Sequence, residues 1–293
     1  MTTAAPAQRL SLLPVIGALA SQAALVTAVL YYFGWAYSRA FYEHFGVAAH
    51  ALGHTTADYV LFSVTAMFQP LIATLLTILA LSAVRRIPTR HAMRSGRPRT
   101  VLRWWVRFLI VVGMLLVATV VVLVYIPTVL AATLDLVAPF LLMTAAASLG
   151  CAYWLRWRYP AILATRRPPR TVMQIQVLAL VGITVIGYLW AVADFAERRG
   201  AADAVHQEQA SFVDRPAVVV FSVDRLGVEG SGTRMGEITA PGEKYRYVYS
   251  GLWLLARTDD YYYLLPQQWQ AGRDRVVVVS HGDTIRIDIA RNP

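Results

Sequence analysis

The sequence predicts an α-helical transmembrane bundle of five spans followed by a small all-β antiparallel domain, either a barrel or a sandwich. Three observations lead to this prediction. Five apolar stretches fill the first 195 residues, each about as long as the roughly 20 residues that cross a bilayer as a helix. No Asp or Glu occurs in residues 59–134 or 136–193. After Asp194 the composition becomes polar, and from Pro216 it alternates as strands do.

The five predicted spans cover residues 12–32, 59–84, 106–126, 134–154 and 172–192 of a transmembrane domain that occupies residues 1–195. A backbone in lipid must satisfy its hydrogen bonds internally, so helices are the expected form. The alternative for the first stretch is a cleaved signal peptide, because Arg9 precedes it and Ala18-Leu19-Ala20 imitates a cleavage site. The apolar run continues to Leu30, which favours an uncleaved anchor.

The distribution of arginine predicts the orientation of these spans. Residues 1–194 contain 15 Arg against four acidic residues, a balance of +11, whereas residues 195–293 have a balance of −1. Most of the excess lies between the second and third and between the fourth and fifth spans, on the same side as Arg9. By the positive-inside rule that side is the cytoplasm, which places the N-terminus inside and the tail outside. A single Lys beside 26 Arg is typical of a GC-rich genome and favours a bacterial plasma membrane.

The same arginines are candidates for contact with anionic lipid headgroups, beyond the lipid bilayer as a whole. The alternative is that they only fix the topology. Two short loops against a membrane do not suit nucleic acid, and no nucleic-acid partner is expected. The candidates for headgroup contact are Arg85, Arg86, Arg90, Arg94, Arg166 and Arg167.

The connection after the first span, residues 34–56, is rich in aromatic residues and histidine. Trp35, Phe41, Tyr42 and Phe45 suit an amphipathic segment that lies in the outer membrane interface.

A metal site is one hypothesis for this connection, because His50, His54 and Asp58 would share one face of a continuous helix. The alternative is a capping box from Thr55 to Asp58, which would start the second span and leave His54 outside it. Gly53 also weakens a continuous helix. A pH-responsive contact is a third hypothesis for the same surface.

The tail divides into a linker or helical extension, residues 196–215, and an extracytoplasmic β domain, residues 216–293. Strand patterns occur at 217–221, 245–249, 252–256, 261–265, 275–279 and 284–289, and turn signals occur at 250–251, 258–260 and 281–283. Residues 227–236 contain four glycines in an irregular stretch that fits no nucleotide fingerprint. The tyrosines at 261–263 should alternate between the two faces of a strand.

Several function classes lack support in the sequence. No ionisable residue lies in the middle of a predicted span, which argues against a proton-coupled carrier. No catalytic constellation is recognisable, so we lean towards a non-enzymatic protein and expect no cofactor. Cys151 is the single cysteine and excludes an intramolecular disulfide.

Two segments have a recognisable pattern. One is residues 31–46, and the other runs from Tyr245-Arg246-Tyr247 through Tyr263-Leu264-Leu265-Pro266 to Asp283-Thr284-Ile285-Arg286. Both resemble uncharacterised multi-pass membrane proteins of actinobacteria. The resemblance implies the same layout of five spans and a β domain, in a Gram-positive plasma membrane. It implies no activity and no site residue.

The expected function is an integral plasma-membrane protein that presents an external β domain to a protein or envelope partner. A signal would pass through the fifth span, which leads directly into that domain. The alternative is an oligomeric channel or transport component, in which polar residues of several copies face one pathway. A homo-oligomer is therefore an expected partner as well.

Overall fold

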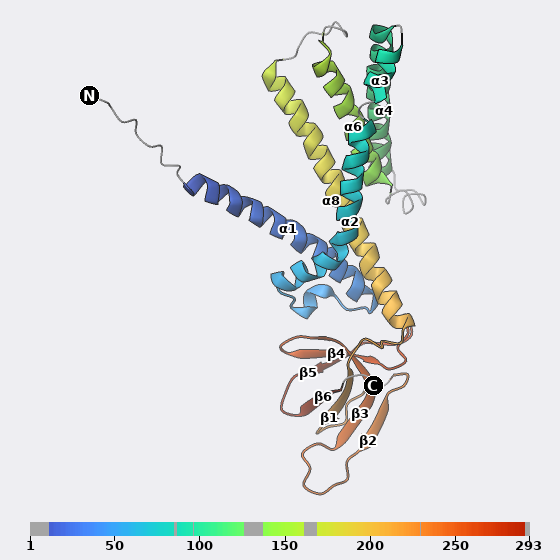
Figure 1. Ribbon diagram of the computed structural model, residues 1–293. Coiled ribbons are helices and arrows are strands. Elements are labelled where there is room, and N and C mark those ends of the chain that lie inside the picture. Colours follow the sequence, from blue (N-terminus) through green and yellow to red (C-terminus); the bar gives the residue numbers. More distant parts are fainter. Residues whose placement is uncertain are drawn as a thin grey trace, which may run out of the picture. The chain divides into compact units, whose positions relative to one another are not determined.

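The structure, a computed structural model, describes residues 12–84, 87–95, 97–125, 137–160, 169–228 and 230–290. It is mostly helical and ends in an antiparallel β sheet (Figure 1). The helices are α1 (Leu12–His44), η1 (Ala49–Leu52), α2 (Thr56–Val84), α3 (Ile87–Arg94), α4 (Pro98–Tyr125), α6 (Ala138–Arg158) and α8 (Arg170–Gln209). The strands are β1 (Ala217–Ser222), β2 (Arg234–Glu237), β3 (Tyr247–Arg257), β4 (Tyr261–Pro266), β5 (Val277–Ser280) and β6 (Ile285–Ala290).

Three of these helices, α4, α6 and α8, are long and apolar enough to cross a membrane. The structure therefore supports three of the five predicted spans. Helices α1 and α2 run through the other two predicted spans. The side chains of residues 12–20, 65–69, 71, 78 and 80–84 in these helices lie outside the described residues, as do residues 126 and 134–136 at the predicted limits of the third and fourth spans.

Contacts within the chain define two compact units. Unit 1 contains residues 1–66 and 196–293, and unit 2 contains residues 67–195. The first part of α2 and the last part of α8 thus belong with the β sheet. The predicted boundary at residue 195 coincides with a change of unit, but the unit that follows it also includes the segment around the first connection.

Unit 2 is held together by close helix packing. A Cβ placed on Gly113 of α4 would lie 2.7 Å from Cγ of Leu149 on α6. A Cβ on Gly187 of α8 would lie 3.0 Å from Cγ of Met143 on α6. Glycine removes the side chain at both contacts, which lets the helices approach as small residues commonly do in membrane bundles.

The six strands form one antiparallel sheet with the order β5-β4-β3-β1-β6, and β2 also pairs with β3. The eleven residues of β3 contact three neighbouring strands and make it the centre of the sheet. Antiparallel pairing was predicted for this region and is confirmed.

Two sequence interpretations of the β domain were wrong in detail. The turn signal at Ser250-Gly251 does not end a strand, because Gly251 adopts φ +78 and forms a bulge within β3 opposite β1. A Cβ at Gly251 would collide with the carbonyl of Gly232. The glycine-rich stretch also contains β2, whose Met235 pairs with Tyr249. Tertiary pairing, and not local propensity, makes β2 a strand.

The predicted barrel or sandwich is not confirmed, because the described strands pair into one sheet with β5 and β6 at opposite ends. The predicted turn at residues 281–283 and the predicted alternation of the tyrosines are present. A turn follows Ser280, with the amide of Ile285 bonded to the carbonyl of Gly282 at 3.1 Å. The strands on its two sides do not pair with each other, since β5 and β6 occupy opposite ends of the sheet. Tyr262 and Tyr263 belong to different hydrophobic clusters, so they alternate between the faces as predicted.

Candidate functional site

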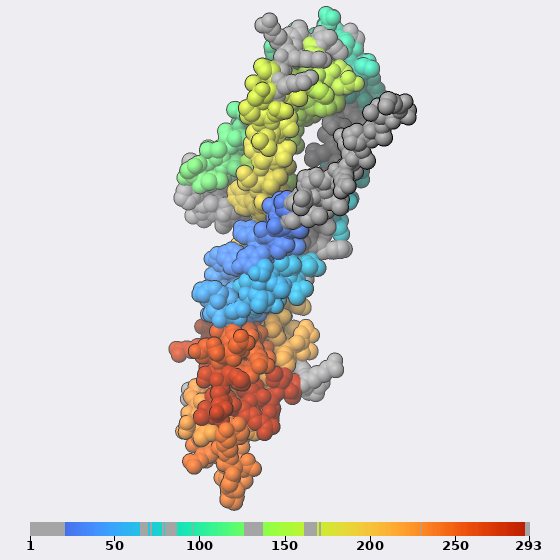
Figure 2. Space-filling model, turned by 90° about the vertical axis from the view of Figure 1, so that its left-hand side faces the viewer, coloured from blue at the N-terminus to red at the C-terminus, as the bar shows by residue number. Residues whose placement is uncertain are grey.

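The candidate site lies in unit 1, where one face of the sheet packs against helices. A single buried cluster, here named the aromatic core, joins the end of α1, the connection after it, the end of α8 and the sheet. In the space-filling view, the blue and cyan surface of residues near 40–60 lies directly against the orange and red surface of the sheet (Figure 2). The buried members of the aromatic core are Phe41, Tyr42, Phe45, Val47, Ala49, Leu52, Ala204, Phe212, Trp253, Leu255, Tyr263, Leu265 and Trp269.

This arrangement corrects the predicted role of the first connection. Phe41, Tyr42 and Phe45 are buried in protein, with 5%, 8% and 4% of their surface exposed, and are not available to lipid. The ring of Phe45 lies 5.1 Å from that of Trp269, between centroids. An amphipathic pattern beside a membrane can thus be satisfied by a folded domain instead of the headgroup layer.

Helix α1 crosses α8 through small residues. Ala36 and Ala196 are both fully buried at the crossing. A Cβ on Gly200 would collide with the carbonyl oxygen of Tyr37. The small residues Ala196, Gly200 and Ala204 recur every fourth position, a spacing that brings helix backbones close. This signal was present in the sequence, but the interpretation of residues 196–215 as a linker or extension did not use it.

Polar contacts reinforce the crossing of α1 and α8. The hydroxyl of Tyr37 donates to Oδ2 of Asp203 at 3.0 Å, and Nε of Arg199 lies 3.2 Å from the same carboxylate. Burial, and secondly the hydrogen bond to Asp203, raise the pKa of the Tyr37 phenol. The phenol therefore remains a hydrogen-bond donor at physiological pH.

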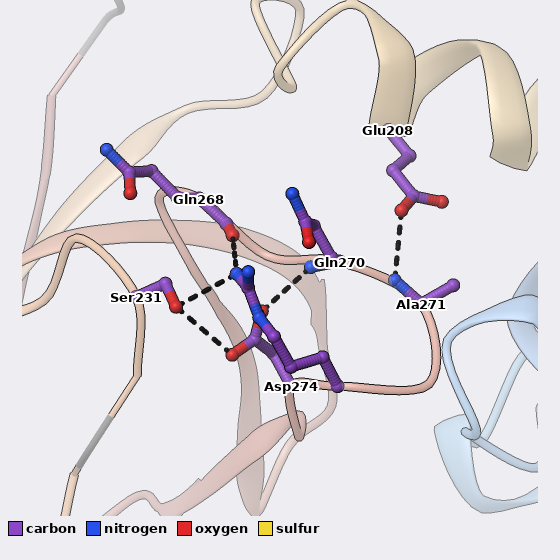
Figure 3. Close-up of polar contacts among 7 residues, drawn as sticks. Glu208, Ser231, Gln268, Gln270, Ala271 and Asp274 are labelled. Carbon is purple, nitrogen blue, oxygen red and sulfur yellow. Dashed lines mark hydrogen bonds and ion pairs between the residues drawn. The ribbon is translucent and has the colours of Figure 1, made fainter.

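Glu208, near the end of α8, connects three parts of unit 1. One carboxylate oxygen lies 2.8 Å from Nε2 of His44 at the end of α1. The other accepts a 2.9 Å hydrogen bond from the amide of Ala271, in the loop after β4 (Figure 3). The imidazole of His44 also packs edge-on against Trp269 of the aromatic core.

The loop that carries Ala271 is fixed by an ion pair. Arg273 contacts Oδ2 of Asp274 at 2.8 Å and donates to the carbonyl of Gln268 and to Oγ of Ser231. The Asp274 carboxylate also accepts from the amide of Gln270, as Figure 3 shows. Hydrogen bonding from Arg273 lowers the pKa of the Asp274 carboxyl, so the pair stays charged at neutral pH.

Arg215, just after α8, is a half-buried cation within this arrangement. It donates to the carbonyl of Leu255 at 2.9 Å and to Oε1 of Gln207 at 3.0 Å. Its guanidinium also lies 5.6 Å from the centre of the Phe41 ring. Partial burial lowers the pKa of this guanidinium, yet arginine remains protonated in proteins. The charged side chain of Arg215 contacts α8, the sheet and α1.

The proposed metal ligands are not brought together. Among the described residues, no group of three His, Cys, Asp or Glu side chains could hold a metal ion. His50 is exposed in η1, and Gly53 ends η1 in the left-handed conformation. The capping box is confirmed, because the Asp58 carboxylate accepts hydrogen bonds from both the amide and the hydroxyl of Thr55, each at 2.8 Å. These bonds, first the backbone one, lower the pKa of the Asp58 carboxyl.

His54 lies outside α2, as the capping box predicts, and is surrounded by aromatic rings. Its ring centre is 5.5 Å from that of Tyr42, 5.6 Å from Tyr59 and 5.4 Å from Phe62. Its Nε2 atom is buried and has no hydrogen-bond partner among the described residues. Burial lowers the pKa of the imidazole, while the charge of Asp58 raises it by less.

The surface of unit 1 also contains an open groove of about 480 Å³. Arg39 lies over the ring of Trp35 at its edge, 5.5 Å from the ring centre. The exposed Arg39 and Glu43 form an ion pair beside the groove. None of the lining residues has a buried polar group that points into it. Its lining residues are Trp35, Arg39, Glu43, Gly46, Val47, Ala48, Ala49 and His50.

The candidates for lipid contact are described only in part. Arg90 and Arg94 are both exposed on α3, whereas Arg85, Arg86, Arg166 and Arg167 lie outside the described residues. Helix α3 packs through Ala92 against Leu102 of α4 and Leu155 of α6. The basic ends of three helices therefore meet within unit 2.

Comparisons of the chain with protein-family models, with curated proteins and with solved structures find no match.

Proposed function

We propose that the chain is a multi-pass protein of the bacterial plasma membrane that presents its β domain to a protein or envelope partner outside the cell. In this proposal it crosses the membrane five times, with the N-terminus in the cytoplasm. Binding at the β domain is relayed to α1 and α8. The observation that carries the proposal is the aromatic core. Its side chains pack the sheet directly against the ends of α1 and α8, so the sheet is not joined to them by a flexible linker alone.

The grouping of segments in each unit supports the proposed topology. With five spans, the first connection and the tail must lie on one side of the membrane, and unit 1 contains both. The Arg-bearing start of α4 and end of α6 must lie together on one side, and their side chains share a core in unit 2. Both groupings are what the arginine distribution requires.

A surface suited to binding lies on the hairpin between β2 and β3. Residues 239–244 are all exposed, and the hairpin extends from the end of the sheet away from α1 and α8 (Figure 1). Residues along this hairpin, from Glu237 to Tyr247, line a polar depression of about 300 Å³. Lys244 and Glu243 place opposite charges at the tip, which suits a polar partner.

Thiol labelling tests the topology. In a Cys151→Ser background, we introduce Glu243→Cys or Arg94→Cys and expose intact cells to a membrane-impermeant maleimide. We expect Glu243→Cys to react at once and Arg94→Cys to react only after permeabilisation. The opposite pattern would refute the proposed orientation.

Site-specific photo-crosslinking tests the binding role. A photoreactive amino acid at Lys244 should give a discrete adduct in native cells, which mass spectrometry identifies. The matched control is the same substitution at Asp259, which is exposed in the turn between β3 and β4. Equal adducts from both positions, or none from Lys244, would argue against a partner-binding hairpin.

A further inference from the structure

The ends of α3, α4 and α6 bring arginines from three separate segments of the sequence into one basic surface. Ala92, Leu102, Val106 and Leu155 form the buried core beneath it. Because these residues come from all three helices, the charged residues beside them are held in one region of unit 2. The basic surface is here defined as Arg94, Arg99, Arg103, Arg107, Arg156 and Arg158, all exposed.

Three of these arginines form a stripe on α4. Arg99, Arg103 and Arg107 recur every fourth residue, so they share one side of the helix over about 12 Å. Beside them, the rings of Trp104 and Phe108 stack with centres 5.3 Å apart. These rings are 58% and 45% exposed. A charged stripe therefore lies next to an apolar aromatic one.

No acidic residue of these helices compensates the charge. The sequences of α3, α4 and α6 contain neither Asp nor Glu. Six exposed guanidinium groups in one region repel one another unless an anion lies between them. The three helices that form the basic surface do not supply that anion.

Exposed apolar side chains continue around the basic surface. Trp157 lies between Arg156 and Arg158 on α6 and is 51% exposed, and Met93 next to Arg94 on α3 is 85% exposed. A nucleic acid would neutralise the arginines and could stack bases on the rings, but it offers no hydrocarbon to the exposed Met93. The headgroup region of a bilayer offers both phosphate and hydrocarbon within a few ångströms.

We propose that the ends of α3, α4 and α6 bind the phosphate headgroup of an anionic phospholipid, with its acyl chains along the Trp104 and Phe108 stripe. Arginine suits this role because its planar fork donates two hydrogen bonds to one phosphate. Its aliphatic stem also covers apolar surface while the charge stays at headgroup level. This inference rests on the proposed membrane insertion but is independent of binding at the β domain.

The test uses the full chain in detergent micelles, titrated with phosphatidylglycerol, phosphatidylcholine or inorganic phosphate, with the melting temperature as readout. We expect the wild-type protein to bind phosphatidylglycerol at least about 10-fold more tightly than phosphatidylcholine, with no matching effect of inorganic phosphate. Equal binding of the two lipids would overturn the proposal. An equal response to inorganic phosphate would show an anion site without lipid selectivity and would also overturn it.

The variant Arg99→Gln/Arg103→Gln/Arg107→Gln should lose that preference by about 10-fold or more. The matched control, Arg234→Gln/Arg246→Gln/Arg257→Gln, removes three exposed arginines from the β domain and should keep it. The variant Arg99→Lys/Arg103→Lys/Arg107→Lys keeps the charge but removes the bidentate fork, so its lipid preference should fall between that of the wild type and that of the glutamine variant. If the control loses as much as the α4 variant, the surface is nonspecific and the proposal fails. If lipid preference persists while Lys244 gives no adduct, only the proposed function fails.

Discussion

Units 1 and 2 both carry aromatic residues near helix ends, yet they expose them differently. In unit 1, Phe41 and Phe45 are nearly inaccessible because the β sheet covers them. In unit 2, Trp104 and Phe108 remain exposed, and none of the described residues of that unit covers them. The same sequence signal, aromatic residues flanking an apolar stretch, therefore has two structural outcomes. Aromatic residues beside an apolar stretch therefore indicate a membrane interface only where no folded domain buries their rings.

The largest contrast should come from truncating one phenylalanine in each unit. Phe45→Ala removes a ring that is 4% exposed, so we expect it to destabilise the protein by about 3–5 kcal/mol. Phe108→Ala makes the same chemical change at a 45% exposed ring and should cost within about 1 kcal/mol. Thermal unfolding of the full chain in detergent measures both. Similar losses of unfolding free energy at the two sites would contradict the difference in burial between Phe45 and Phe108.

Two glycines of α8 provide a second contrast. Gly200→Ala should destabilise the protein by about 1–3 kcal/mol, because the added methyl would collide with the Tyr37 carbonyl. At Gly182, in the same helix but in unit 2, a Cβ meets nothing within 4 Å. Gly182→Ala should therefore be neutral or stabilise by up to about 1 kcal/mol. Denaturant unfolding compares the two, and a neutral Gly200→Ala would contradict the close crossing.

A pH effect should come from His54 in unit 1. Burial lowers the folded-state pKa of His54 below its ordinary value of 6.5. The stability gained from the neutral imidazole is thus fully present above pH 6.5 and is lost as pH falls towards the folded pKa. We expect the melting temperature of His54→Gln to depend less on pH between about 7.5 and about 5.5 than that of the wild type. His50→Gln, at an exposed position, is the control and should leave the pH dependence unchanged.

The smallest effect concerns the end of α8, where the backbone of unit 1 is strained. Ser211 and Phe212 adopt φ of 54 and 57, a left-handed conformation that costs most residues about 1 kcal/mol or more. Phe212 is held there by the aromatic core, but Ser211 is exposed. Ser211→Gly should therefore stabilise the protein by about 0.5–1 kcal/mol, measured by thermal unfolding. Destabilisation would show that the serine side chain has a role not seen in its contacts.

Local sequence patterns predicted most of the helices and strands. Apolar length alone located helices at all five expected positions, and alternation located most strands, because both patterns depend on local periodicity. The capping box at Thr55 was predictable for the same reason. β2 was missed because its pairing with β3 depends on residues ten or more positions away.

The candidate site was harder to predict, because it joins distant segments. Glu208 contacts His44, 164 positions earlier, and the Tyr263 hydroxyl donates to the carbonyl of Ala51, 212 positions earlier. No local pattern encodes such contacts. The small-residue spacing from Ala196 to Ala204 and the arginine spacing from Arg99 to Arg107 were local signals, and both were readable before the structure.

The end of α1 and the β sheet form a single folded unit through the aromatic core. A double-mutant cycle between Phe45 and Trp269, whose ring centres are 5.1 Å apart, tests this claim directly. Unfolding free energies of Phe45→Ala, Trp269→Ala and the double variant give the coupling energy. We predict a coupling of about 1 kcal/mol, as expected for aromatic pairs in contact. Additive effects, within about 0.3 kcal/mol, would contradict a shared core.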